Sequence, residues 1–151
     1  MKILSNFFKI TSYCAFIGWA ILIITPSSQL GRNVVVAIAV ILLSAIYTYL
    51  ICFGKKYDSP DVNVGGHFLS LKGVINLFKS PRAVLAGWIH YLAFDLMIGL
   101  FIVVDAEKYA VPHWMLIPCL LLTLMFGPAG LLVYVLLRAF FTDGSLIMSF
   151  F

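Results

Sequence analysis

Two ionisable side chains, His90 and Asp95, lie inside an apolar run that extends from Ala83 to Val104 without another charge. A run of this length can cross a bilayer. An aspartate at the centre of such a helix costs about 3 kcal/mol on insertion scales, so a membrane helix carries one for a reason. Both groups can bind and release protons, and both can form hydrogen bonds between helices. They are the first candidates for chemistry in this chain.

The composition indicates an integral membrane protein with room for one domain, residues 1–151. Of the 151 residues, 63% are hydrophobic and 11% are charged, whereas a soluble domain carries about 25% charged residues. The net charge of +4 would suit nucleic acid, but the basic residues cluster at the ends of apolar runs, as in membrane proteins. The three cysteines lie inside apolar runs without CxxC spacing, which argues against a disulfide framework or a zinc site.

Four apolar segments are long enough to span the membrane, which predicts an all-α protein with four transmembrane helices. They cover about residues 7–25, 34–53, 83–104 and 111–138. No A-x-A-like cleavage site follows the first segment, so we interpret it as a span rather than a signal peptide. In the fourth segment, Gly127-Pro128 removes a backbone hydrogen bond and predicts a kink.

Lysine and arginine residues predict the orientation of these spans. With both termini inside, eight of the ten basic residues face the cytoplasm, so the positive-inside rule gives an N-in, C-in topology. The long second loop is then cytoplasmic and contains a turn signal at Ser59-Pro60-Asp61. Over about residues 67–79 its apolar residues recur at helical spacing, which predicts a short amphipathic helix on the membrane surface. We expect the protein in a bacterial inner (plasma) membrane.

A helical wheel divides the third span into an aliphatic half, expected to face lipid, and a polar half, expected to face the bundle. The aliphatic half consists of Leu85, Ala86, Ile89, Leu92, Ala93, Leu96, Leu100, Val103 and Val104, and the polar half of Gly87, Trp88, His90, Tyr91, Phe94, Asp95, Ile98 and Gly99. His90 and Asp95 project about 140° apart and differ in depth by about 7.5 Å. They are therefore predicted to flank a pocket rather than to bond each other.

The fourth span carries a matching stripe of small and polar residues. Its members are Cys119, Thr123, Gly127, Gly130, Tyr134 and Arg138. Depth counting for antiparallel helices places Tyr134 near His90 and the Gly127-Pro128 kink near Asp95. Residues of these types often only pack helices together, whereas a buried aspartate is harder to explain by packing.

Several strings of the chain resemble the abscisic-acid-deficient-type integral membrane proteins, a neoxanthin-synthase-like family whose bacterial relatives are mostly of unknown function. The resemblance is close from about Leu77 to Arg138 and loose over the first two spans. It is carried by Leu77-Phe78-Lys79-Ser80-Pro81, by Gly87-Trp88-Ile89-His90-Tyr91-Leu92-Ala93-Phe94-Asp95-Leu96-Met97-Ile98-Gly99, by Asp105-Ala106 and Val111-Pro112-His113, and by Pro118-Cys119-Leu120-Leu121-Leu122-Thr123-Leu124-Met125-Phe126-Gly127-Pro128-Ala129-Gly130-Leu131-Leu132.

This resemblance implies acid–base isomerisation of a carotenoid or another isoprenoid lipid. The plant members are implicated in neoxanthin synthesis, in which a 5,6-epoxide opens and an allene forms. That reaction needs an acid for the epoxide oxygen and a base for an adjacent proton, and no redox cofactor. His90 and Asp95 would fill these roles with Tyr134 as a helper donor. The expected substrate-binding residues are Trp88, Tyr91, Phe94, Thr123, Gly127 and Arg138, and a further outer-loop site would include Asp105 and His113.

Three other functions remain open on the sequence. The chain could be a non-catalytic carotenoid- or lipid-binding protein, acting as a homo-oligomer or beside a partner membrane enzyme. A small transporter using His90 and Asp95 as a proton relay is less favoured, because no polar side chain follows between Leu96 and Val104. A metal site formed by His67, His90, Asp95 or His113 lacks any HxxH or HxxxH spacing, so we predict no metal and no cofactor.

Overall fold

The computed structural model describes residues 2–58 and 66–142, and within them every regular element is helical. Three helical rods are long and apolar enough to cross a membrane: residues 2–24, 29–57 and 81–108. The turn predicted at Ser59-Pro60-Asp61 lies outside the described residues. The elements are α1 (Lys2–Ile24), α2 (Gln29–Val36), the π-helix η1 (Ala37–Leu43), α3 (Ser44–Phe53), the 3₁₀-helix η2 (Gly54–Tyr57), α4 (Leu71–Leu77), α5 (Pro81–Lys108), α6 (His113–Phe126) and α7 (Pro128–Ala139).

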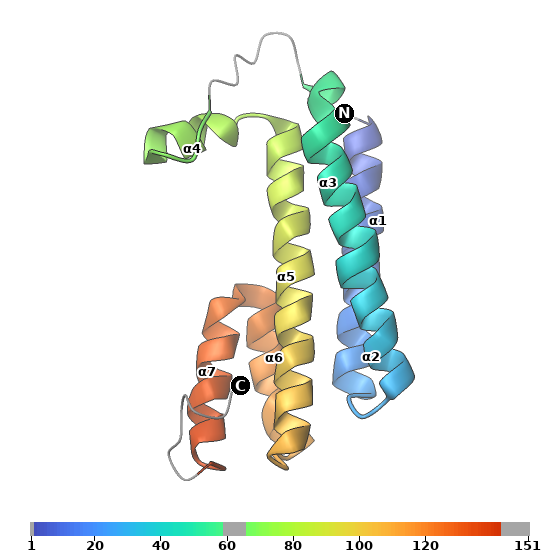
Figure 1. Ribbon diagram of the computed structural model, residues 1–151, viewed down its shortest axis with the longest axis vertical. Helices are drawn as coiled ribbons and strands as arrows, with labels where there is room; N and C mark the ends of the chain where they lie inside the picture. The colour runs from blue at the N-terminus through green and yellow to red at the C-terminus, as the bar shows by residue number, and fades with distance from the viewer. Residues whose placement is uncertain (1, 59–65, 143–151) are drawn as a thin grey trace.

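The helix α5 is the centre of the molecule (Figure 1). It contacts α1 along its length and the rod made of α2, η1 and α3 beside it. Two clusters of buried apolar side chains lie along this contact, one around Trp19 and Leu96 and one around Leu43 and Ile89. The three apolar rods therefore pack through aliphatic surfaces, as expected where van der Waals contact drives the association of membrane helices.

The predicted fourth span is not a single helix. The chain reverses at Gly127, and α6 and α7 lie side by side as a hairpin next to one half of α5 (Figure 1). Gly127 has φ +38°, a conformation that a side chain disfavours, and Pro128 begins the returning helix. With 14 and 12 residues, neither arm is as long as the roughly 20 residues that a bilayer requires.

The reversal also changes the predicted position of the C-terminal end. The end of α7 lies at the end of the molecule opposite to the start of α1 (Figure 1), whereas the N-in, C-in prediction expects the two on one side. The basic residues still divide unequally between the ends. One end carries Lys2, Lys9, Lys55, Lys56, Lys72, Lys79 and Arg82, and the other carries Arg32, Lys108 and Arg138.

The amphipathic helix predicted over 67–79 is present but shorter. It forms α4, whose first turn is capped by the Ser70 hydroxyl accepting a hydrogen bond from the Gly73 N–H. It projects to one side at the end of the bundle, at a steep angle to α5 (Figure 1). Its apolar residues Leu71 and Ile75 are 76% and 55% exposed, and Phe68, which precedes the helix, is 80% exposed. An exposed apolar stripe on a helix in this position suits a membrane surface.

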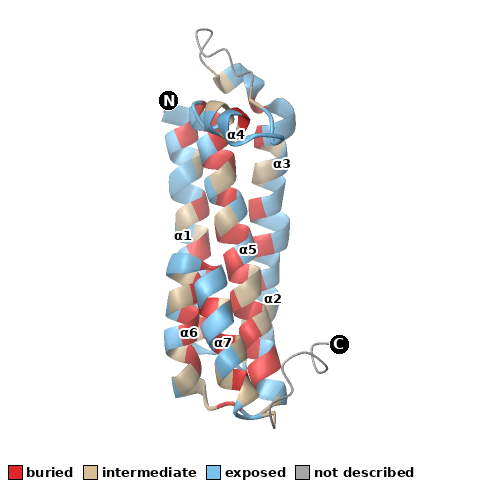
Figure 2. Ribbon diagram, turned by 90° about the vertical axis from the view of Figure 1, so that its left-hand side faces the viewer, coloured by how far each residue is buried: buried red, intermediate tan, exposed pale blue. Residues whose placement is uncertain are grey.

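The predicted lipid-facing half of α5 is wrong, and the predicted bundle-facing half is buried only in part, at Asp95 and Gly99. The aliphatic half is buried against α1 and the α2–α3 rod, since Ile89 and Leu96 are fully buried and only Val104 of that set is well exposed. On the polar half, His90 and Phe94 are exposed. The physical reason is the hairpin, which covers only part of α5 (Figure 2) and leaves the upper part of the polar half open.

Candidate functional site

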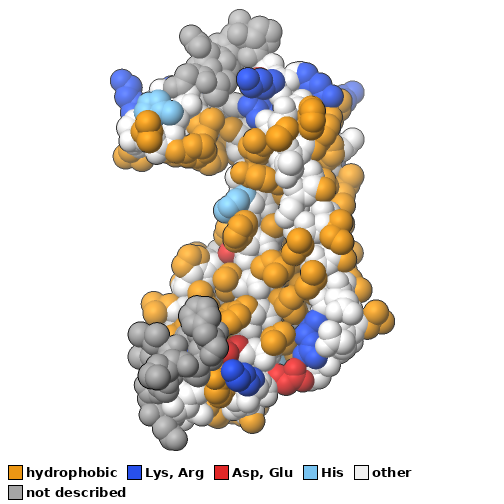
Figure 3. Space-filling view, viewed as in Figure 1, with side chains coloured by type: hydrophobic (Ala, Val, Ile, Leu, Met, Phe, Trp, Pro, Cys, Tyr) orange, Lys and Arg blue, Asp and Glu red, His pale blue; other side chains and the backbone are white. Residues whose placement is uncertain are grey.

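A cavity of about 500 Å³ lies between α3, α4 and the first half of α5. It belongs to a hollow on one side of the molecule, between α4 and the hairpin, whose walls are mainly hydrophobic (Figure 3). We call this cavity the lateral groove, because it opens to the side of the bundle, where lipid would lie. Its lining residues are Tyr47, Ile51, Phe68, Leu77, Phe78, Arg82, Ala83, Gly87 and His90.

His90 forms part of the wall of the lateral groove. Its ring stacks on Phe94 one turn further along α5, with 4.4 Å between ring centroids and an angle of 21° between planes. On the other side it meets Tyr47 of the α3 helix at 5.9 Å. The imidazole is thus held between two aromatic rings and remains exposed to the groove.

Asp95 lies on the same helix next to the tip of the hairpin. The side chain is 8% exposed, and its Oδ2 has no hydrogen-bond partner among the described residues. The carboxyl group packs directly against Gly127, where an added Cβ would come within 2.5 Å of Oδ1. The sequence prediction that the Gly127-Pro128 break lies near Asp95 is confirmed, and Gly127 allows the backbone to approach the carboxyl group this closely.

The aromatic residues predicted to bind substrate divide between two sides of α5. The Tyr91 hydroxyl donates a hydrogen bond of 2.9 Å to the Leu124 carbonyl near the end of α6. The Trp88 indole stacks on Tyr91 but donates to the Ser12 hydroxyl of α1 at 3.1 Å. Tyr91 and Phe94 therefore border the region between the lateral groove and Asp95, whereas Trp88 is turned toward α1.

A second polar cluster fastens the base of the hairpin to the end of α5. Asp105 Oδ2 accepts a hydrogen bond from the Tyr134 hydroxyl at 2.6 Å and pairs with the Arg138 Nε at 2.8 Å. The Arg138 guanidinium also lies 4.4 Å from the centre of the Tyr109 ring. Tyr134 and Arg138 are almost completely buried. The predicted proximity of Tyr134 and His90 is wrong, because the chain reversal at Gly127 carries Tyr134 back toward Asp105.

The remaining predicted site residues make local contacts. Thr123 is buried, donates to the Cys119 carbonyl at 2.8 Å, and packs against Gly130 where the two arms of the hairpin touch. His113 meets the Ile23 carbonyl at 2.7 Å, at the end of α1. Asp105 therefore contacts α7, whereas His113 contacts the end of α1. Within the described ranges, no three His, Cys, Asp or Glu side chains come together as a metal ion would require.

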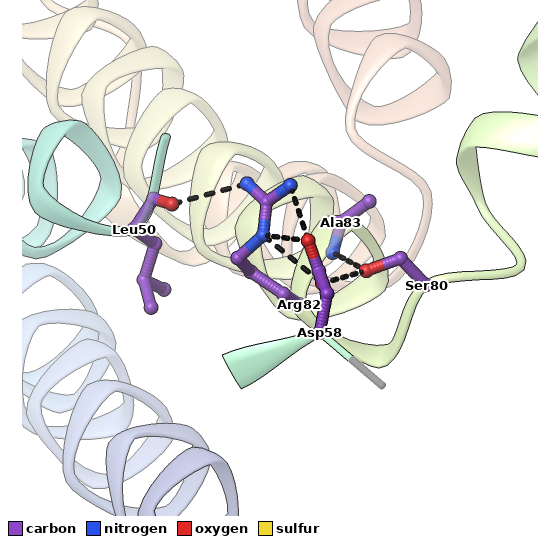
Figure 4. Close-up of polar contacts among 5 residues, drawn as sticks. All are labelled: Leu50, Asp58, Ser80, Arg82 and Ala83. Carbon is purple, nitrogen blue, oxygen red and sulfur yellow. Dashed lines mark hydrogen bonds and ion pairs between the residues drawn. The ribbon is translucent and has the colours of Figure 1, made fainter. Parts of the chain in front are cut away.

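The sequence interpretation missed a buried network at the entrance to α5 (Figure 4). Arg82 donates to Asp58 through its Nε, pairs with it through its Nη2 at 2.9 Å, and donates to the Leu50 carbonyl at 3.1 Å. The Ser80 hydroxyl donates to Asp58 at 2.6 Å and accepts from the Ala83 N–H. The only signal in the sequence was an arginine directly after Ser80-Pro81 at a helix start, and its partner is distant in the chain.

This network ties the end of the α3 rod to the start of α5, next to the lateral groove that Arg82 also lines. Burial by itself would raise the pKa of the Asp58 carboxyl, but the hydrogen bonds from Arg82 and Ser80 outweigh it and hold that pKa below its usual range. Asp58 is therefore ionised at neutral pH and paired with Arg82, which fixes one wall of the groove.

Comparison with known proteins yields one match. The family model described as ABA DEFICIENT 4-like matches residues 6–134, which include both His90 and Asp95, the hairpin tip and most of α7. No curated protein and no solved structure matches the chain. The match extends over all three long helices and the reversal of the chain. It therefore covers most of the fold and not only a short sequence motif. The chain belongs to the ABA DEFICIENT 4-like family.

Proposed function

We propose that this protein takes the end group of a carotenoid or related isoprenoid lipid into the lateral groove and isomerises it by acid–base catalysis inside the membrane. The observation that carries the proposal is the position of Asp95. It is a buried carboxyl group with an Oδ2 that lacks a partner in the described chain, and it lies on the same helix as an exposed histidine. Elsewhere in proteins, buried polar atoms of this kind are nearly always paired.

The shape of the site supports a lipid as substrate. The groove is mainly apolar, opens sideways, and has a volume of about 500 Å³. A cavity of this size suits one end group, while the remainder of a membrane-length molecule would lie along the exposed apolar surface of the helices. Phe94 is 61% exposed beside it and offers a flat surface for a polyene.

In the proposed reaction Asp95 is the acid and His90 is the base. Asp95 protonates the epoxide oxygen of the substrate, and the carbon–oxygen bond breaks. His90 removes a proton from the adjacent polyene carbon, and the electron pair of that C–H bond becomes the new double bond. One proton is given and one is taken, so the step is an isomerisation. His90 and Asp95 are separated by Phe94 and Tyr91 around α5, which suits contact with two different atoms of one substrate.

The orientation in the membrane is part of the proposal. The end that carries the N-terminus and α4 holds most of the lysine and arginine residues, and the positive-inside rule assigns that end to the cytoplasm. In this arrangement the groove lies in the cytoplasmic half of the bilayer and the hairpin in the other half, in the inner membrane of a bacterium.

A non-catalytic lipid-binding role is the second candidate. It is favoured by the distance of Tyr134 from the groove, since the predicted helper donor is bound to Asp105 instead. A binding protein would retain the same ligand without converting it. The amount of product formed therefore distinguishes the two functions.

Expression of the chain in a bacterial strain that supplies an epoxidised carotenoid, followed by chromatography of the extracted pigments, tests the proposal. We expect an allenic product with the unchanged chain, and about a hundredfold less with Asp95→Asn or His90→Gln. Leu132→Val is the matched control, because Leu132 is 60% exposed on α7 away from the groove. Full conversion by Asp95→Asn would exclude the acid–base mechanism, and bound pigment without any product would leave the binding role.

A further inference from the structure

The tip of the hairpin presents backbone donors next to Asp95. Helix α7 begins at Pro128 immediately after the reversal, and no side chain caps it. The N–H groups in the first turn of a helix have no partner within that helix, and here Ala129 and Gly130 supply them. A helix of this length, 12 residues, also carries partial positive charge at that end.

A second and independent feature points to a ligand at this position. Asp95 is more than nine-tenths buried, and its carboxyl group lies against Gly127, the residue that precedes α7. The neighbouring Tyr91 hydroxyl gives its hydrogen to the Leu124 carbonyl, which leaves Asp95 Oδ2 unpaired within the described chain. A carboxyl oxygen without a partner and a helix start whose first N–H groups have no partner within that helix thus lie side by side.

We infer that Asp95 and the first turn of α7 form a subsite for a single oxygen atom, a hydroxyl or epoxide oxygen, on the end group of an apolar lipid. This inference rests on the proposed function and adds the first turn of α7 as a second partner of the substrate oxygen. The ligand oxygen accepts hydrogen bonds from the protonated Asp95 carboxyl group and from an α7 backbone N–H. Two donors on one oxygen are the arrangement that stabilises charge developing there when a carbon–oxygen bond breaks.

Other ligands fit this position less well. A metal cation would meet the positive end of α7 and a single carboxyl group, and no cluster of metal-binding side chains occurs within the described ranges. A free anion would have to pass the apolar surface formed by Phe94 and the groove walls. A neutral oxygen carried by an apolar molecule can arrive from the bilayer. It would hold the end group at Asp95 with the adjoining carbons directed toward His90.

Binding of two carotenoids that differ only in ring oxygens tests the subsite. Zeaxanthin carries a hydroxyl on each ring, and β-carotene has the same polyene without them. We would titrate both into the purified chain in lipid nanodiscs and follow the absorbance shift. The wild-type chain should prefer zeaxanthin by about tenfold or more, which corresponds to about 1.4 kcal/mol. Asp95→Leu should remove this preference, so that the variant binds the two pigments with equal affinity.

A second variant separates the backbone donors from the carboxyl group. Ala129→Pro removes one N–H in the first turn of α7, where proline is tolerated, and should lower the preference for zeaxanthin several-fold at an unchanged melting temperature. If Asp95→Leu does not fold, Ala129→Pro by itself tests whether the oxygen subsite exists. As a control, Phe94→Ala should weaken both pigments equally, because it removes stacking surface and no hydrogen bond.

The outcomes distinguish the subsite from the proposed function. Equal wild-type affinities for the two pigments, or a preference that persists in both Asp95→Leu and Ala129→Pro, would overturn the oxygen subsite while the lipid groove stands. Failure of the wild-type chain to bind either pigment would overturn the proposed function together with the subsite.

Discussion

Two aspartates on α5 are equally buried and differently partnered. Asp95 and Asp105 are each 8% exposed and lie on the same helix. Asp105 accepts a hydrogen bond from Tyr134 and pairs with Arg138, whereas Asp95 Oδ2 has no partner in the described chain. Burial alone therefore does not distinguish a structural carboxyl group from an available one, and the partners do.

The hairpin explains the difference between the two positions. Its base is held by the Asp105–Arg138 pair, and its tip ends at Gly127 against Asp95. At the base, side chains from α7 satisfy the carboxyl group. At the tip, the hairpin brings backbone rather than a side chain against Asp95, because Gly127 carries no side chain, and Tyr91 of α5 is the neighbouring side chain. The first arrangement pairs the carboxyl group within the fold, and the second leaves its Oδ2 without a partner in the described chain.

The largest effect on stability is expected from Arg138→Leu. This change leaves Asp105 buried without its cationic partner, and breaking a buried ion pair in this way costs about 3–5 kcal/mol. The exposed pair Arg32–Glu107 is the control, because Glu107 is 55% exposed and such pairs contribute at most about 1 kcal/mol. Thermal unfolding followed by circular dichroism in detergent should show a large loss for Arg138→Leu and a small one for Arg32→Leu. Similar losses for the two variants would contradict the structural role of Asp105.

Gly127→Ala should affect both stability and conversion. The positive φ of Gly127 disfavours any side chain by about 1–3 kcal/mol, and the new Cβ would press on Asp95 Oδ1. We expect a lower melting temperature. We also expect less pigment conversion per folded molecule, which unfolding alone would not cause. Gly31→Ala is the control, since Gly31 lacks a positive φ and an added Cβ there would meet the side chains of Ile21 and Ser28, far from Asp95. If Gly127→Ala converts pigment normally, the hairpin tip does not shape the site.

A smaller effect with a distinct pH dependence is expected at Asp58, a carboxyl group outside the spans that is fully paired. The pKa of Asp58 is lower in the folded chain than in the unfolded chain, where an aspartate has a pKa of about 3.9. Its contribution to stability is therefore present above that pKa and is lost as the pH falls below it. Asp58→Asn should destabilise the protein at pH 7 by about 1–2 kcal/mol. In melting curves recorded from pH 7 to pH 3, the gap between the two chains should close below about pH 4. A gap that stays constant over this range would show that Asp58 is not ionised in the folded chain.

The sequence alone predicted the elements better than their faces. The membrane character, the three long helices and α4 all followed from apolar run length and periodicity. The orientation of α5 did not, because we assumed that polar residues face the bundle. His90 and Phe94 are instead exposed above the hairpin, and the aliphatic residues Ile89 and Leu96 form the core. Which face of a helix is covered depends on how far its neighbours extend, and a helical wheel contains no such information.

The chain reversal was only partly visible in the sequence. Gly127-Pro128 indicated a break near Asp95, and that position is confirmed. The sequence did not distinguish a kink from a full turn, because both interrupt the same hydrogen bonds. The turn is stabilised by the contact between Arg138 and Asp105, two residues far apart in the chain.

The most direct test replaces each aspartate by asparagine and measures melting temperature and pigment conversion for both variants. We predict that Asp95→Asn melts at the wild-type temperature or above and loses about a hundredfold in conversion. Asp105→Asn should melt well below the wild type, because Arg138 is left buried without an anionic partner, and should keep conversion per folded molecule within about tenfold. An Asp95→Asn chain that melts lower and converts pigment normally would contradict the account, since Asp95 would then be the structural aspartate.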